Sequence, residues 1–67
     1  MSITSEYIVT GMTCEHCVMS VTEEVGEVPG VEQVDVDLAS GRVTVVGDAD
    51  AGAVRAAVQE AGYEVAA

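Results

Sequence analysis

The sequence contains no lysine, phenylalanine or tryptophan, and only two arginines stand against 12 aspartate and glutamate residues. The resulting formal net charge of −10 at pH 7 excludes the basic patch that binds the phosphates of nucleic acids, and it disfavours an anionic membrane surface as a partner. Tyr7 and Tyr63 are the only aromatic residues, so the core must be built from aliphatic side chains and methionine. We interpret the acidic excess as a solubilising surface, the alternative being attraction to a basic patch on a partner.

A long hydrophobic run is also missing. No stretch of about 18 apolar residues is present, which excludes a membrane-spanning helix, and the N-terminal segment lacks the basic and apolar parts of a signal peptide. Because the chain starts at Met1 and ends soon after its last patterned segment, we expect residues 1–67 to form one complete cytoplasmic domain. A chain of 67 residues buries too little surface for a deep substrate cleft as well as a core, which favours a binding or carrier module over an enzyme.

Four segments have the composition or the alternation of β-strands. They are residues 3–10, 31–38, 42–46 and 63–66. A short turn at residues 39–41 joins the second and third segments into a hairpin. The side chains expected to face the core from the first three strands are Tyr7, Val9, Val34, Val36, Leu38, Val43 and Val45.

A helix is predicted between the first two strands, because apolar residues there recur at spacings of three and four. Its stripe consists of Val18, Val21, Val25 and Val28. The helix begins at about Glu15, with Thr13 as a plausible N-cap, and it stops at Gly26 and the Pro29-Gly30 pair that follows.

A second helix follows the hairpin, with Asp48 or Asp50 as its cap and Gly62 as a left-handed C-terminal residue. Its inner stripe consists of Val54, Ala57, Val58 and Ala61. The element order is therefore β-α-β-β-α-β. This order predicts an α+β fold in which both helices cover one face of a four-stranded antiparallel sheet.

The two cysteines of the chain, Cys14 and Cys17, are three residues apart at the predicted start of the first helix. This spacing places both sulfurs on roughly the same side, and the unpaired N–H groups of a helix N-terminus stabilise thiolates. Because thiols in the cytoplasm stay reduced, the pair is expected to bind a metal or to be redox-active rather than to form a structural disulfide.

Ligand number and softness favour Cu(I) as the metal. A structural zinc site needs four ligands, whereas the segment offers two cysteines and His16, which a helical start directs away from the sulfurs. Two soft thiolates suit Cu(I) and leave room for an incoming thiolate. A carrier of zinc or mercury, and a thiol-disulfide oxidoreductase that uses the same C-x-x-C motif, are the alternatives.

The segment GMTCEHC resembles the GMxCxxC metal loop of the heavy-metal-associated domain family, and the resemblance extends to PGV after the first helix and AGY near the end. It is closest to the small bacterial copper chaperones of the CopZ type. The resemblance implies a ferredoxin-like fold, with Cu(I) bound by Cys14 and Cys17. It also implies transfer of the copper by ligand exchange to the cytoplasmic metal-binding domains of a P-type copper-exporting ATPase.

Four further residues are expected to support the site without binding the metal. By the same resemblance, Met12 packs beneath the loop and Tyr63 approaches it from near the C-terminus. His16 is expected to be a surface group that makes loading or transfer sensitive to pH. Thr13 precedes the first cysteine, where zinc-selective relatives tend to carry a carboxylate. Met19 is expected to be exposed near the loop, where it could belong to a docking patch.

The resemblance also bears on assembly. We expect a monomer without copper, and a homodimer is plausible when two loops pool four thiolates around copper, with His16 as a possible extra ligand. Many carriers of this family use basic patches against acidic targets, whereas this chain has no lysine. Its docking polarity is therefore expected to be reversed, or its docking to be weakly electrostatic.

Overall fold

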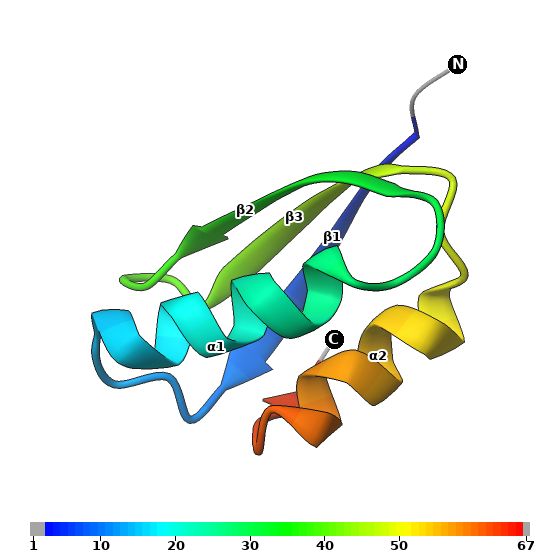
Figure 1. Cartoon of the computed structure of the whole chain (residues 1–67). Coiled ribbons are helices and arrows are strands. Elements are labelled where there is room, and N and C mark those ends of the chain that lie inside the picture. Colours follow the sequence, from blue (N-terminus) through cyan, green and yellow to red (C-terminus); the bar gives the residue numbers. More distant parts are fainter. Residues whose placement is uncertain (1–2, 67) are drawn as a thin grey trace.

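The computed structural model describes residues 3–66, which contain four strands and two helices in the predicted order (Figure 1). The elements are β1 (Thr4–Thr10), α1 (Glu15–Gly26), β2 (Val31–Asp37), β3 (Arg42–Gly47), α2 (Ala51–Glu60) and β4 (Glu64–Val65). None of the helices in this part of the chain is long and apolar enough to cross a membrane.

The strands form one antiparallel sheet in the order β2-β3-β1-β4. Both helices lie on the same face of the sheet (Figure 1), with α1 packed against β2, α2 packed against β4, and the helices in contact with each other. The predicted α+β fold, a four-stranded sheet under two helices, is therefore confirmed. The consequence for the site is that α1 begins beside the end of β1 and close to the segment that follows α2.

The core lies between the sheet and the helices and consists almost entirely of valine. The largest fully buried side chains are Val21, Val25, Val43, Val45, Val54 and Val58. Tyr7 is the one aromatic residue in the core and is 6% exposed. Valine suits this role because its volume fills a thin layer and its branched side chain packs well on strands.

Several residues of the predicted core are less buried than the pattern suggested, Val28 and Ala61 among them. Val34 and Val36 are half-buried, because β2 is an edge strand with a neighbour on one side only. Val18 is also half-buried, whereas Val21 and Val25 of the same stripe are buried. Leu38 is half-buried too, but it lies just after β2 rather than within it.

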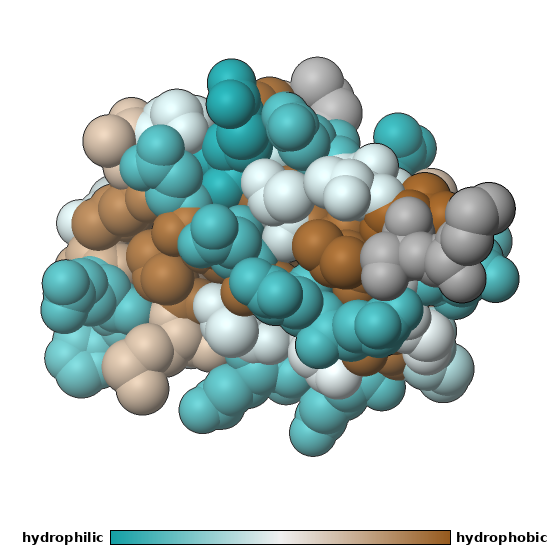
Figure 2. Space-filling view, turned by 90° about the horizontal axis from the view of Figure 1, so that it is seen from above, coloured by the Kyte–Doolittle hydropathy of each residue, from teal (hydrophilic) through white to brown (hydrophobic). Residues whose placement is uncertain are grey.

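The surface is a mixture of hydrophilic and hydrophobic residues. Seen from above, hydrophilic residues cover much of the molecule, and hydrophobic residues are exposed toward the left end of the view and again to the right of its centre (Figure 2). Near the metal loop predicted from the sequence, Met19 is exposed.

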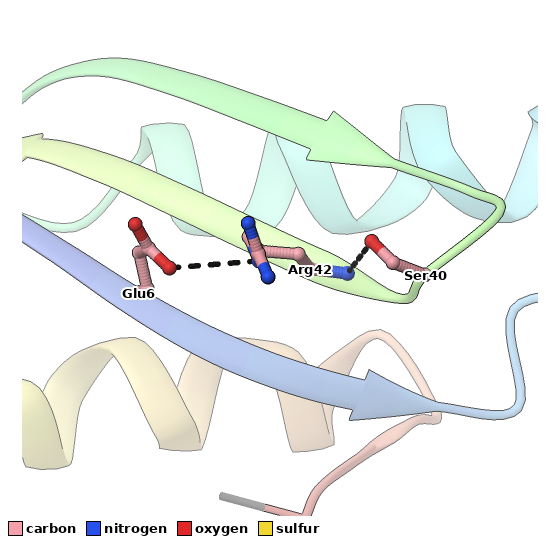
Figure 3. Close-up of polar contacts among 3 residues, drawn as sticks. All are labelled: Glu6, Ser40 and Arg42. Atoms are coloured by element: carbon pink, nitrogen blue, oxygen red, sulfur yellow. Dashed lines mark hydrogen bonds and ion pairs between the residues drawn. The ribbon is translucent and has the colours of Figure 1, made fainter.

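The face of the sheet without helices carries an exposed ion pair. Glu6 and Arg42 project from neighbouring strands, and Arg42 Nε lies 3.5 Å from Glu6 Oε1 (Figure 3). The backbone N–H of Arg42 donates to Ser40 Oγ at 3.3 Å in the preceding turn. Since both charged side chains are more than half exposed, we expect the ion pair to add little to stability.

Of the two caps that the sequence allowed for the second helix, Asp48 and Asp50, the structure has Asp50. Asp50 is its N-cap, and its Oδ2 accepts a hydrogen bond from the N–H of Ala53 at 3.0 Å. After the C-cap Ala61, Gly62 takes a φ of +95°, which favours glycine because no Cβ is present to clash. The chain reverses there, and Tyr63 is directed back toward the start of α1.

Candidate metal-binding site

The site is built on the first turn of α1. Cys14, not Thr13, is the N-cap, with an extended backbone at φ −156° and ψ 173°. Its carbonyl oxygen accepts hydrogen bonds from the N–H groups of Cys17 at 3.1 Å and Val18 at 3.3 Å. The prediction of Thr13 as N-cap was wrong, because the chain enters the helix one residue later and leaves Thr13 outside the first turn.

The two sulfurs lie close together. Cys14 Sγ is 3.7 Å from Cys17 Sγ, and neither cysteine is in a disulfide. Cys14 is exposed and Cys17 is half-buried. In a capping box the N-cap side chain accepts from the backbone N–H of the third helical residue, and the side chain of that residue accepts from the backbone N–H of the N-cap. Here both are thiols, and the Cys14 side chain makes no capping hydrogen bond.

Hydrogen bonding favours the thiolate form of Cys17. The backbone of Thr13 makes the largest contribution, the Tyr63 hydroxyl and the backbone and thiol of Cys14 add to it, and partial burial opposes them. Together they lower the pKa of Cys17 from 9.0 to about 6. Cys17 is thus mostly a thiolate at neutral pH, which is the form that binds metals and acts as a nucleophile.

Tyr63 lies against this loop from the other end of the chain. It is half-buried and packs against the core, and its pKa is raised chiefly by its hydrogen bond with Cys17. A Cβ on Gly11 would meet Tyr63 Cδ1 at 3.4 Å, and Gly11 has a φ of +93°. The glycine therefore lets the loop turn beside the aromatic ring.

The other predicted supporting residues occupy different surroundings. Met12 is partly buried and packs against the core. Thr13 Oγ1 lies 3.9 Å from Cys17 Sγ. His16 is exposed, and its carbonyl oxygen accepts from Ser20 Oγ at 3.1 Å. Within residues 3–66 no group of three His, Cys, Asp or Glu residues is placed to hold a metal ion, so the structure does not bring His16 into one ligand set with the cysteines.

One feature near the site was only partly anticipated. A shallow groove on α1 is lined by Val18, Met19, Thr22 and Glu23. Met19 is 58% exposed and is one of two large hydrophobic side chains exposed in the described part of the chain. The sequence indicated an exposed Met19, but it placed Val18 in the core, so the groove itself could not be predicted.

The model of the heavy-metal-associated domain family matches residues 6–64, and the chain therefore belongs to this family. It is 46% identical over 61 residues to the copper chaperone CopZ of Bacillus subtilis, covering 87% of this chain and 88% of that protein. The solved structure of a CopZ metallochaperone superimposes with a TM-score of 0.91 at 30% identity, covering 94% of this chain and 98% of the other. The resemblance inferred from GMTCEHC is thus confirmed.

A second kind of relative is much longer. Copper-transporting ATPase 1 of Rhizobium meliloti is 43% identical over 65 residues, covering 94% of this chain but 8% of the ATPase. The chain therefore spans most of the length of the small chaperone that it matches and only a small segment of the transporter. The same domain occurs both as a small separate protein and as one part of a longer copper-transporting ATPase.

Proposed function

We propose that the chain is a copper chaperone, in which Cys14 and Cys17 bind Cu(I) as thiolates and pass it to another protein. The observation that carries the proposal is the pair of sulfurs 3.7 Å apart at the start of α1, one of them exposed. The small relative named as a copper chaperone supports the same function.

Transfer follows from the low number of ligands. An incoming thiolate attacks the bound Cu(I) from the exposed Cys14 side, one new Cu–S bond forms, and one Cu–S bond to this chain breaks. A second exchange completes the transfer. No electron is transferred, and copper remains Cu(I) throughout. The chain therefore acts as a carrier and not as an enzyme.

Copper is favoured over zinc by the donor set. Zinc in proteins favours four-coordinate sites, and within residues 3–66 no third His, Cys, Asp or Glu is grouped with the cysteines. Thr13 cannot supply a carboxylate oxygen beside Cys14. Two soft thiolates suit Cu(I). We therefore expect Zn(II) to bind weakly and harder ions to bind more weakly still. A mercury carrier would use the same two thiolates, so competition between the two metals is needed to distinguish a mercury carrier from a copper carrier.

The receiving protein is proposed to be the metal-binding domain of a P-type copper-exporting ATPase in the cytoplasm. A copper-transporting ATPase contains a segment 43% identical to this chain. Donor and receiver built on the same domain present similar loops, so exchange between them is close to balanced in free energy. Net transfer then runs toward the ATPase, because the ATPase exports the copper that it receives.

Two loops can also meet each other. We propose that the chain without copper is a monomer and that a homodimer forms when copper is bound by thiolates from two loops. Size-exclusion chromatography with light scattering at increasing copper content tests this. A mass that does not change with copper would exclude the dimer.

The proposed metal chemistry is tested by an anaerobic competition for Cu(I) between the reduced chain and a strong colorimetric chelator. Cys14→Ser and Cys17→Ser should each lower the affinity more than about 100-fold, which is more than the loss of a group that merely supports a ligand. His16→Gln is the matched control on the exposed position between them, and we expect it to change the affinity only a few-fold.

The same competition repeated with Zn(II) and Hg(II) decides the metal. Copper binding that survives a large excess of zinc supports the proposal. If zinc competes equally, the chain is a zinc carrier. If the reduced chain takes no copper but its disulfide cycles readily with a thiol reductant, the chain is a thiol-disulfide oxidoreductase and not a copper carrier.

A further inference from the structure

An acidic residue stands between the two cysteines. Glu15 is the first residue of α1, directly after the N-cap Cys14 and two residues before Cys17. Glu15 is exposed, as is Cys14. Because consecutive Cα atoms are about 3.8 Å apart, the Glu15 carboxylate lies within roughly 10 Å of the Cys14 sulfur. This is about the Debye length at 0.1 M ionic strength, so the carboxylate acts on any charged group that approaches the sulfur.

No basic side chain is paired with this carboxylate in the part of the chain that the structure describes. The loop and α1 contain no lysine or arginine. Of the two arginines in the sequence, Arg42 pairs with Glu6 on the face of the sheet without helices (Figure 3), and Arg55 is on α2. A carboxylate in the first turn of a helix also interacts with the partial positive charge of the helix N-terminus. A test of any further role of Glu15 must therefore separate it from this structural one.

Reactants reach the sulfurs from the side of Cys14. Cys14 is exposed, whereas Cys17 is half-buried, and neither is in a disulfide. The Cys14 side chain makes no capping hydrogen bond, and its sulfur lies 3.7 Å from that of Cys17. A molecule that enters over Cys14 therefore passes the Glu15 carboxylate, which repels a negative charge and attracts a positive one.

We propose that Glu15 selects by charge the small molecules that react at the cysteine pair, and that it slows anionic low-molecular-weight thiols. For copper the inference rests on the proposed function, because such thiols compete with the receiving protein for bound Cu(I). An attacking thiolate forms one new Cu–S bond, one Cu–S bond to this chain breaks, and no electron is transferred. The chain thus retains copper against anionic thiols while uncharged thiols can still react.

The selection can be measured without copper, because the same cysteines react with disulfide reagents. A cysteine thiolate forms a bond to one sulfur of the reagent, the reagent S–S bond breaks, and the other half leaves as a thiolate. At about pH 8, where an ordinary histidine is uncharged, dithiobis(nitrobenzoate) is a dianion, dithiodipyridine is uncharged and cystamine is a dication. Initial rates follow from mass spectrometry of acid-quenched samples. Dividing each rate by that of the uncharged reagent removes changes in thiol ionisation or fold.

Glu15→Gln removes the charge with little change of shape, and Glu15→Lys reverses it. Asp48→Asn and Asp48→Lys are the matched controls, because Asp48 is exposed and follows β3 at the far end from the start of α1 (Figure 1). At about 0.1 M ionic strength, the rate ratio for the dianion should rise about threefold in Glu15→Gln and about tenfold in Glu15→Lys. The ratio for the dication should fall by similar factors. Salt at about 1 M should remove most of these differences, because it screens exposed charges.

Two results would overturn the inference. If the Asp48 variants change the rate ratios as much as the Glu15 variants do, the net charge of the whole chain accounts for the selection. If Glu15→Gln leaves the ratios unchanged, even though all three rates rise together, Glu15 acts on the thiols or on the helix and not on the approaching molecule. We expect the Asp48 variants to change the ratios by less than about 1.5-fold, because distant exposed charges are screened.

The consequence for copper is tested on the chain loaded with Cu(I). Loss of copper to glutathione, which is anionic at about pH 8, is compared with loss to uncharged mercaptoethanol by timed desalting and metal analysis. Relative to mercaptoethanol, loss to glutathione should be about twofold faster from Glu15→Gln than from wild type. If the disulfide reagents are selected by charge but the reduced chain takes no copper, the carrier function fails and the role of Glu15 stands. If copper is bound but the reagents are not selected, the role of Glu15 fails and the carrier function stands.

Discussion

Cys14 Sγ and Cys17 Sγ lie 3.7 Å apart because one residue is the N-cap of α1 and the other is the third residue of the helix. An N-cap position normally carries an oxygen-bearing side chain that accepts from an N–H of the first turn. Here a thiol takes that position and makes no capping hydrogen bond. The first turn of α1 thus lacks a stabilising side-chain cap at the point where the site requires sulfur.

Replacing the N-cap thiol by a hydroxyl should therefore stabilise the protein without metal. Serine is a favoured N-cap, and we expect Cys14→Ser to raise the Tm by roughly 2–8 °C while copper binding is lost. Thermal unfolding followed by circular dichroism under reducing conditions measures this. Cys14→Ala removes the sulfur without adding a cap and is the matched control. If serine and alanine give the same Tm, the missing cap has no effect on stability.

Tyr63 should control how readily Cys17 ionises. The Tyr63 hydroxyl is one of the groups that lower the pKa of Cys17 to about 6, so Tyr63→Phe should raise the pKa of Cys17. Ultraviolet absorbance of the thiolate against pH, in a Cys14→Ser background, reports a single thiol. Tyr7→Phe removes the other hydroxyl, which is not among the groups that shift this pKa, and should leave the titration unchanged.

The same lowered pKa makes stability depend on pH in a stated direction. Because the folded pKa of about 6 lies below the ordinary 9.0, folding favours the thiolate. This contribution is fully present above pH 9 and is lost as the pH falls toward 6. In denaturant unfolding at several pH values, the free energy of unfolding should rise less across this interval in Tyr63→Phe than in the parent. If the free energy of unfolding depends on pH equally in both proteins, the assigned hydrogen bond is contradicted.

Gly47 should tolerate no side chain. It has a φ of +131°, and a Cβ there would overlap the carbonyl oxygen of Gly30 where β3 meets the start of β2. We expect Gly47→Ala to lower the free energy of unfolding by roughly 1–3 kcal/mol. Gly26 is the matched control, since nothing lies within 4 Å of a Cβ added there. Gly26→Ala should raise stability by up to about 1 kcal/mol.

Asp50 should contribute to stability through its cap on α2. Its carboxylate accepts from the N–H of Ala53, and Asp50→Ala should lower the free energy of unfolding by about 0.5–2 kcal/mol. Asp48→Ala removes an exposed carboxylate two residues earlier, outside the cap, and should change stability by less than about 0.5 kcal/mol. Urea unfolding of both variants measures the difference, and equal losses would show that general charge, not capping, matters.

Local patterns in the sequence were sufficient for most of the fold. Alternation on β1 and β3 and the valine stripes of α1 and α2 predicted the elements, because the repeat of each element decides which side chains face the core. Asp48 or Asp50 was predicted as the N-cap of α2 and Gly62 as its C-terminal residue, because capping depends on nearby residues, and the structure has Asp50 and Gly62 in these positions. The N-cap of α1 was predicted at Thr13 because threonine favours that position, whereas the backbone places the cap at Cys14.

The sequence by itself determined the element order, the valine core, the acidic surface and the two cysteines at the start of a helix, since each of these depends on composition or on neighbours along the chain. Only the tertiary structure decided that the Tyr63 hydroxyl lowers the pKa of Cys17, that β2 is an edge strand and that Val18 lines a groove. These features depend on how the sheet is ordered and how helices pack across it. Such contacts join residues far apart in the chain, and no local pattern encodes them.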